Sequence, residues 1–392
     1  MQFYMEKQAA AEKNPEKPMA NVNLNTNYKI NSVSRAYPEA GRKLFKSLDC
    51  YETTTLDFGD IENYTVKTMI GSGRFSVVFI GIDKNGNDCA IKTYRPIPVD
   101  FIKRELFFMK VVRNIPNTLH FYDLIKDPLT GTIAHVCEYV KTGRKRIDYR
   151  SFTLDEVRFY MYQLLLTLDA CHSIGIMHRD VKPDNLLINR EQKKIRLIDW
   201  GLADIYYSKQ QYNTGVGTLR YRGPELFLGY RYYDYAVDIW AAGITFGEML
   251  IRYPFFEVNY QEELIHEVSD LLTTSAILVY AEKFGIDISD STLRSMPEYT
   301  FFDWDSLINQ GRPEMRDPDA SDLLRKMLTV DHQQRITAHE ALEHKFFYPL
   351  KKQMAEANSA DQGNASTNDQ VVENGKNDGN LLDIEKIAID QK

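Results

Sequence analysis

The stretch from residue 178 to residue 201 reads HRDVKPDNLLINREQKKIRLIDWG and constrains this chain more than any other part of it. Four polar residues stand out in it: Asp180, Lys182, Asn185 and Asp199. A phosphoryl group in transfer carries negative charge, so a protein that moves one must mainly position it and neutralise that charge. We expect Asp180 to accept the proton of an attacking hydroxyl and Lys182 to contact the phosphate. Asn185 and Asp199 offer the oxygen ligands that Mg²⁺ prefers.

Upstream, residues 71–76 read Gly-Ser-Gly-Arg-Phe-Ser and lie between two stretches that alternate as β-strands do. Glycine lets a backbone approach phosphate oxygens, although the same turn also occurs in ordinary hairpins. Lys92, on the next predicted strand, is placed to pair the α- and β-phosphates of a nucleotide. Glu105, in the helix that follows, is its candidate partner. The alternative is that both are ordinary exposed residues.

The periodicity of apolar residues predicts an α+β protein with two lobes. Strands are expected at 64–70, 75–82, 88–94, 119–125 and 132–139, and a helix at 99–113. An Asn-Gly pair at 85–86 predicts a type I′ hairpin turn. These elements form a small β-rich lobe at about 64–140. A long amphipathic helix at 157–175 begins a larger helical lobe at about 141–350.

Both ends of the chain have the composition of disordered segments. Residues 1–33 are rich in Asn, Lys, Ala and Glu. Residues 351–392 form an acidic tail, which from Met354 onward carries eight acids and three lysines. We expect both ends to be disordered; the alternative for residues 381–389, which read LLDIEKIAI, is a short helix or docking peptide.

Charge and cysteine content exclude several classes of protein. The net charge of −7 argues against nucleic-acid binding, and no apolar run approaches the ~18 residues of a membrane span. The first residues lack the apolar core of a signal peptide. Four scattered cysteines predict reduced thiols and therefore a cytoplasmic or nuclear location.

Further motifs follow in the second half of the chain. Residues 223–225 read Gly-Pro-Glu, and we expect Glu225 to form a buried ion pair with Arg335. By resemblance to protein kinases, Asp238 is expected to hold the backbone around Asp180 from a helix beneath it. Thr218 is placed to hydrogen-bond Asp180, unless it is an ordinary loop threonine.

The order of these motifs resembles that of protein kinases, and several segments are similar to the catalytic (alpha) subunit of casein kinase II, of the CMGC group. Residues 198–203 read Ile-Asp-Trp-Gly-Leu-Ala, with Trp200 where most kinases have phenylalanine. Residues 158–183 and the segment SRAYPEAGRKLFKSLDCYE at 34–52 are also similar. Lys182, two residues after Asp180, is typical of Ser/Thr kinases. The resemblance covers about residues 34–350.

The resemblance implies a bilobal, ATP-dependent serine/threonine protein kinase that uses Mg²⁺ and accepts GTP as a second nucleotide. It implies that an arm at 34–63 packs on the kinase domain at 64–350 and keeps it active without phosphorylation. It also implies a dimeric regulatory (beta) subunit that completes a heterotetramer. The implied nucleotide contacts are Gly71, Ser72, Gly73, Arg74, Phe75, Ser76, Val78, Ala90, Lys92, Glu138, Val140, Asn185, Leu187, Ile198 and Asp199.

The expected substrate-binding residues depart from the family pattern. Casein kinase II prefers acidic residues around its target Ser or Thr, which basic residues contact. The candidates here are Thr218, Arg220, Arg222, Lys103 and Arg104. Gly215 and Leu219 stand where the family has arginines. We therefore expect a weaker acidic preference.

Two other interpretations stay open. A pseudokinase acting as a scaffold would normally lack Lys92, Asp180 or Asp199, and this chain has all three. A kinase of the cyclin-dependent or mitogen-activated type would need phosphorylation of its activation loop, where Tyr212 and Thr214 are the candidates.

Overall fold

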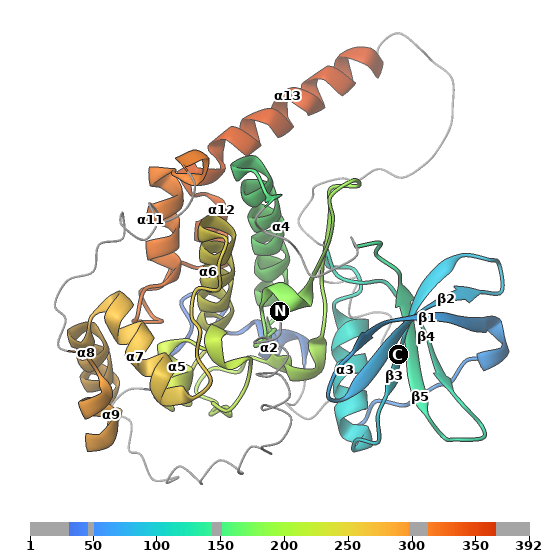
Figure 1. The fold of residues 1–392 in the computed structure, drawn as a ribbon, viewed down its shortest axis with the longest axis horizontal. Coiled ribbons are helices and arrows are strands. Elements are labelled where there is room, and N and C mark those ends of the chain that lie inside the picture. The colour runs from blue at the N-terminus through green and yellow to red at the C-terminus, as the bar shows by residue number, and fades with distance from the viewer. Residues whose placement is uncertain (1–30, 46–50, 143–150, 298–312, 366–392) are drawn as a thin grey trace, which may run out of the picture.

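The computed structural model describes residues 31–45, 51–142, 151–297 and 313–365, and every structural statement below concerns these residues. They form a small lobe with a β-sheet and one helix beside a larger helical lobe (Figure 1). The predicted two-lobed α+β class is therefore confirmed. The predicted disordered stretch 1–33 lies almost entirely outside the described residues.

The small lobe, called the N-lobe below, is an antiparallel sheet of five strands in the order β1-β2-β3-β5-β4. Its elements are β1 (Tyr64–Ser72), β2 (Ser76–Asp83), β3 (Asp88–Tyr94), α3 (Val99–Val111), β4 (Phe121–Lys126) and β5 (Ile133–Glu138). Two clusters of buried side chains lie in this lobe. One of them, around Ile102 and Leu106, joins α3 to the sheet, and this fixes where α3 can present its other side chains.

The hairpin between β2 and β3 differs from the predicted type I′ turn. Only Gly86 has a positive φ, of 86°, whereas a type I′ turn needs two such residues. The carboxylate of Asp83 accepts hydrogen bonds from the N–H groups of Asn85 (2.9 Å) and Asn87 (2.8 Å). This local capping favours a three-residue loop that ends on a left-handed glycine.

The larger lobe, the C-lobe, is built around α6 (Ala236–Ile251), in which all 16 residues are buried. A helix that is apolar on every side belongs in the middle of a core, and α4 (Leu154–Ser173) packs beside it (Figure 1). A capping box of Thr153 and Glu156 starts α4. The other helices are α5 (Pro224–Phe227), α7 (Gln261–Leu272), α8 (Thr274–Phe284), α9 (Asp290–Ser295), α11 (Pro318–Met327), α12 (Ala338–Leu342) and α13 (Tyr348–Ala365).

Short elements at the top of the C-lobe carry the polar motifs toward the N-lobe. They are β6 (Ile176–Met177), η3 (Pro183–Asn185), β7 (Leu186–Asn189), β8 (Lys194–Leu197), η4 (Trp200–Leu202), β9 (Asp204–Ile205) and η5 (Leu219–Tyr221). β6 pairs with β9, and β7 pairs with β8. Before the sheet, α2 (Ala40–Leu44) and η1 (Ile61–Asn63) belong to the N-terminal segment.

The C-terminal segment corrects one prediction. The tail expected to be disordered from residue 351 is helical as far as Ala365, because α13 continues through it and projects from the C-lobe (Figure 1). Residues 366–392 lie outside the described part. Among the described helices none alone is long and apolar enough to cross a membrane; α7 and α8 meet that test only as a pair bent by 108°.

Candidate active site

The loop between β6 and β7 carries Asp180, and Asp238 of α6 holds its backbone from below. The two carboxylate oxygens of Asp238 accept hydrogen bonds from the N–H groups of His178 (2.8 Å) and Arg179 (2.7 Å). His172 of α4 contacts the same carboxylate at 3.0 Å. Burial favours the neutral acid, but these histidines lower the pKa of Asp238 below its ordinary value. Asp238 is therefore a buried charge that fixes the loop, as the sequence predicts.

Arg179 holds this loop in an unusual conformation. Its φ is 64°, in the left-handed region that non-glycine residues rarely enter. Its guanidinium donates to the Leu202 carbonyl oxygen at 2.7 Å and to the Tyr233 hydroxyl at 3.0 Å, and it pairs with Asp204 at 3.0 Å. Strain of this kind persists only where surrounding contacts over-determine it, and here those contacts come from the segment after Asp199.

Asp180 lies at the centre of a compact polar cluster. Lys182 Nζ is 2.7 Å from Asp180 Oδ2 and 2.6 Å from Thr218 Oγ1. The N–H and hydroxyl of Thr218 both donate to Asp180 Oδ1, at 2.9 and 2.8 Å. Asn185 Nδ2 donates to the carbonyl oxygen (2.8 Å) and to Oδ2 (3.0 Å) of Asp180. The structure therefore gathers Lys182, Asn185 and Thr218 around Asp180.

Asn185 and Asp199 are the two oxygen donors expected to hold Mg²⁺. Because both bonds of Asn185 use its nitrogen, its Oδ1 accepts no hydrogen bond among the described residues. Asp199 keeps 46% of its side chain exposed. Partial desolvation opposes ionisation of Asp199, but Lys92, His178 and Lys182 lower its pKa below the ordinary value. One carboxylate and one amide oxygen, with room for waters, fit this metal.

The backbone at Asp199 is also left-handed, with φ of 68°. The next residue, Trp200, is 2% exposed and packs its ring against His178 at a centroid distance of 4.7 Å. His178 Nε2 contacts the carbonyl oxygen of Ile198 at 3.1 Å. A buried tryptophan on one side and a hydrogen-bonded carbonyl on the other therefore hold Asp199 in place.

Lys92 of β3 meets Glu105 of α3, as predicted. Lys92 Nζ lies 2.5 Å from Glu105 Oε1 and 3.6 Å from Asp199 Oδ1. Burial opposes the charge on Lys92, but the two carboxylates raise its pKa above the ordinary value. Burial, partly offset by Lys92, raises the pKa of Glu105. A charged lysine at the mouth of the cleft is suited to phosphate oxygens.

The glycine-rich turn joins β1 to β2. A Cβ added at Gly71 or at Gly73 would have its nearest other atom at 3.9 Å, and neither residue has a positive φ. Neither packing nor backbone conformation requires glycine here, so close approach of a ligand is the remaining physical reason. Arg95 braces the turn through Gly73 O (3.1 Å) and Ser72 Oγ (3.0 Å).

The predicted base-binding residues come from both lobes. The set is Val78 of β2, Ala90 of β3, Val140 after β5, Leu187 of β7 and Ile198 after β8. Glu138 lies at the end of β5, and its carboxylate binds Lys194 and Arg196 of β8. Burial raises and these cations lower the pKa of Glu138, with a net downward shift. Only the main chain of Glu138 is left for a nucleotide.

Two predicted substrate-binding residues are corrected. Arg104 donates to the carbonyl oxygen of Ala203 at 2.7 and 3.0 Å and pairs with Asp204 at 3.0 Å. Lys103 donates to the carbonyl oxygen of Glu52 at 2.9 Å. Both side chains thus bind the protein itself, because the face of α3 that carries them is covered by these segments.

The remaining candidates lie near Thr218, with different contacts. Arg222 donates to the carbonyl oxygen of Gly217 at 3.0 and 3.1 Å, so it braces the loop. Arg220 is partly buried and lies close enough to Glu248 to affect its pKa. These two arginines are the cations that the loop offers.

The N-terminal arm, residues 31–45 and 51–63 here, packs on the segment after Asp199 and on α3. The N–H of Ser34 donates to the Tyr206 hydroxyl at 2.8 Å, and Tyr207 donates to the carbonyl oxygen of Phe45 at 3.1 Å. A Cβ at Gly41 would lie 2.2 Å from the Tyr206 carbonyl oxygen, so glycine is required for this approach. The ring of Phe45 lies 6.0 Å from that of Phe107 in α3.

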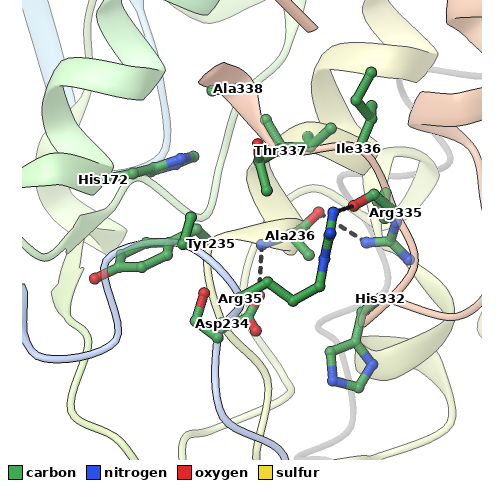
Figure 2. A pocket seen from close by; sticks show the side chains of 13 residues that line it. Arg35, His172, Asp234, Tyr235, Ala236, His332, Arg335, Ile336, Thr337 and Ala338 are labelled. Carbon is green, nitrogen blue, oxygen red and sulfur yellow. Dashed lines mark hydrogen bonds between the residues drawn. The ribbon is translucent and has the colours of Figure 1, made fainter. Parts of the chain in front are cut away.

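The arm also reaches the far side of the C-lobe. Figure 2 shows Arg35 extended toward Arg335, whose carbonyl oxygen accepts from Arg35 Nη2 at 3.0 Å. Arg35 pairs with Glu340 at 2.8 Å as well. Arg35 lines two cavities, and the one drawn in Figure 2, beside His172 and Asp234, has a volume of only about 20 Å³, which is room for a water and not for a substrate.

Sequence reasoning missed three residues around the site. Asp204 bridges Arg104 of α3 and Arg179 of the Asp180 loop, both at 3.0 Å. Tyr94 and His135 form a buried polar contact behind Glu105. Tyr94 stands two residues after Lys92, and the two-residue period of a strand was the available signal that both point the same way.

A family model, described as the protein kinase domain, matches residues 64–347. The match covers more than two thirds of the 392 residues and includes Lys92, Glu105, Asp180, Asn185 and Asp199. The two lobes that it spans enclose the polar cluster described above. This chain belongs to the protein kinase family and is a phosphotransferase of that kind.

Proposed function

We propose that the chain is a serine/threonine protein kinase that transfers the γ-phosphate of ATP to protein substrates. The observation that carries this proposal is the placement of Lys182 between Asp180 and Thr218, at 2.7 and 2.6 Å. An alkyl hydroxyl that approached Asp180 would meet a proton acceptor and a cation together. We regard this as the reason for a Ser/Thr preference.

Each residue of the cluster has a role in that reaction. Asp180 orients the hydroxyl and accepts its proton, and Lys182 neutralises the charge that develops on the transferred group. Lys92, held by Glu105, binds the α- and β-phosphates. Asn185 and Asp199 would hold Mg²⁺, which supplies charge neutralisation at the phosphates when it is bound.

We propose further that this is a kinase of the casein kinase II type, active without phosphorylation. The contacts of the arm with Tyr206, Tyr207 and α3 support this, because an ordered activation segment removes the population cost of a mobile one. Tyr212 is 4% exposed, and its hydroxyl donates to the carbonyl oxygen of Ile205 at 3.0 Å. This argues against the alternative in which Tyr212 must be phosphorylated.

The acidic preference typical of that family is proposed to be weakened. Gly215 and Leu219 carry no charge, Arg104 is paired with Asp204, and Lys103 donates to a backbone carbonyl oxygen. Each exposed charge contact that is missing would lower selectivity by about 0.2–1 kcal/mol. Arg220 and Arg222 remain as the local cations.

The resemblance adds a regulatory subunit and a second nucleotide to the proposal. A dimeric regulatory subunit would bind the N-lobe sheet, where Val66 of β1 (52% exposed) offers apolar surface. GTP would be accepted as a second nucleotide. Residence in the cytoplasm or nucleus also remains a proposal.

The test is phosphate transfer from Mg-ATP to two matched serine peptides, one flanked by acids and one neutral. We expect similar rates on both, and a loss of about 10²- to 10⁴-fold in an Asp180→Asn variant. A strong preference for the acidic peptide would contradict only the proposed weakening of the acidic preference. Binding of ATP without transfer to either peptide would favour the scaffold interpretation. A loss of activity after phosphatase treatment would favour a kinase that needs activation-loop phosphorylation.

A further inference from the structure

A buried chain of hydrogen bonds reaches Glu105 at Oε2, whereas Lys92 contacts Oε1. The Tyr94 hydroxyl lies 3.0 Å from Oε2. Tyr94 is on the same face of β3 as Lys92 because the two are separated by one residue. Strand β3 therefore supplies a donor to each oxygen of one carboxylate.

His135 of β5 completes the chain. It is paired with Lys92 in the sheet, and its Nδ1 lies 2.8 Å from the Tyr94 hydroxyl. The rings of Tyr94 and His135 meet edge to face at 5.6 Å. His135 is 3% exposed and Tyr94 is 6% exposed, so water does not compete for these bonds.

The direction of each bond follows from the chemistry of the three groups. A carboxylate only accepts, and a hydroxyl has one hydrogen, so Tyr94 donates to Glu105. His135 must then carry its hydrogen on Nδ1 and donate to the Tyr94 oxygen. Burial and the charge of Lys92 lower the pKa of His135 to about 3, so its ring is neutral and one nitrogen keeps a hydrogen. Burial and Glu105 raise the pKa of Tyr94, which keeps its hydroxyl protonated.

We infer that Tyr94 and His135 are positioning residues that fix the Glu105 carboxylate, and with it α3, in the orientation that aims Lys92 at the nucleotide phosphates. This deepens the proposed function, on which it rests. A carboxylate held at one oxygen can rotate about its terminal bond, whereas one held at both cannot. In a lobe with a mobile helix, that difference shifts the population toward the docked state.

The expected effect is set by the bond that is removed. Tyr94→Phe keeps the ring and deletes one donor to a buried charged acceptor. We expect kcat to fall about 10- to 100-fold and the affinity for Mg-ADP to fall in the same direction. KM for the peptide should not change, because Glu105, Tyr94 and His135 are not among the residues proposed to bind the peptide. Tyr122→Phe is the matched control, since Tyr122 is 55% exposed on the same sheet.

Rescue at His135 separates hydrogen bonding from packing. His135→Leu removes the donor, and we expect a loss of about 3- to 10-fold. His135→Asn places an amide N–H near the position of Nδ1, so it should recover most of that loss. The double variant Tyr94→Phe, His135→Leu should equal Tyr94→Phe alone, because His135 acts through Tyr94.

The measurements are kcat and KM with a serine peptide, and Mg-ADP affinity by calorimetry, on the full chain. Tyr94→Phe matching wild type in both would overturn the inference, as would His135→Asn behaving like His135→Leu. If wild type transfers no phosphate, the proposed function fails. The Mg-ADP affinities still decide this inference in that case, because Lys92 contacts phosphates that ADP retains.

Discussion

Each lobe buries a glutamate against a cation, and the two pairs are built differently. In the C-lobe, Arg335 donates to both oxygens of Glu225 at 2.6 and 2.9 Å, and both side chains are fully buried. Arg335 also donates to the Ala236 carbonyl oxygen at 2.7 Å. In the N-lobe, Lys92 keeps 19% of its side chain exposed and divides its charge between Glu105 and Asp199.

The pKa values follow the same division. Burial opposes ionisation of Glu225, but Arg335 lowers its pKa below the ordinary value. Burial is only partly offset at Glu105, and its pKa is raised. A buried charge that is completely paired is a fixed support, whereas one that shares its cation with the cleft can respond to a ligand. Glu225 and Arg335 thus form a structural ion pair, whereas Glu105 and Lys92 form one that takes part in function.

Removing one member of the C-lobe pair should give the largest effect on stability. Arg335→Met leaves Glu225 buried without a cation, and we expect a loss of about 3–5 kcal/mol in the free energy of unfolding. Urea denaturation measures it. The double variant Arg335→Met, Glu225→Leu should recover part of the loss. If the double variant is as unstable as the single one, the buried charge is not the cause.

Removing one member of the N-lobe pair should lower activity much more than it lowers stability. Lys92→Met removes a phosphate-binding charge, and we expect kcat to fall about 10²- to 10³-fold. The free energy of unfolding should change by no more than about 1–2 kcal/mol, because Glu105 can take up a proton. Lys84→Met, in the exposed hairpin, is the control. A stability loss as large as that of Arg335→Met would erase the distinction between the two pairs.

A third buried glutamate, Glu248 of α6, sharpens the comparison because no described cation forms an ion pair with it. It is 4% exposed and accepts hydrogen bonds from the Tyr221 hydroxyl (3.0 Å) and the Phe255 N–H (3.2 Å). Burial raises the pKa of Glu248 to about 7. Because no cation is paired with it, the carboxyl is about half protonated near neutral pH.

The pH dependence of stability should reveal Glu248. Its folded pKa of about 7 exceeds the ordinary value of 4.5, so its contribution to stability is complete below pH 4.5 and is lost as pH rises through 7. The expected loss is about 3 kcal/mol at most. Glu248→Gln cannot titrate and should escape it. Urea denaturation of both proteins at pH 5 and pH 8 tests this, and parallel changes in the two would refute the assignment.

The sequence predicted the parts of the site that motifs encode. The glycine turn, the cluster around Asp180 and the pair of Glu225 with Arg335 depend on residue type and order, which a sequence displays directly. The strands followed from alternation of apolar residues, with shifts of one or two positions at their ends. Such features depend on nearby residues in the sequence, or on a motif order that members of one family share.

The parts that failed depend on which distant segment covers a side chain. Arg104 has the positive charge expected of a substrate contact. Only the fold brings Asp204 and the Ala203 carbonyl oxygen to it. That the Glu138 carboxylate is paired, which leaves its main chain for a nucleotide, follows only from the position of β8. Tyr94 and His135 read as ordinary alternating strand residues, and their meeting requires the pairing of β3 with β5.

The docking of the N-terminal arm has a consequence for how this protein should be divided in the laboratory. The family match begins at Tyr64, but within the described part of the chain the arm already contacts the C-lobe at Ser32, whose N–H donates to the Tyr230 hydroxyl at 2.9 Å. A protein shortened to the family boundary would uncover the side chains of Tyr206 and Tyr230 and leave their hydroxyls without these partners. We therefore expect a protein that begins at Tyr64 to be less stable than one that keeps Ser32 and the rest of the arm.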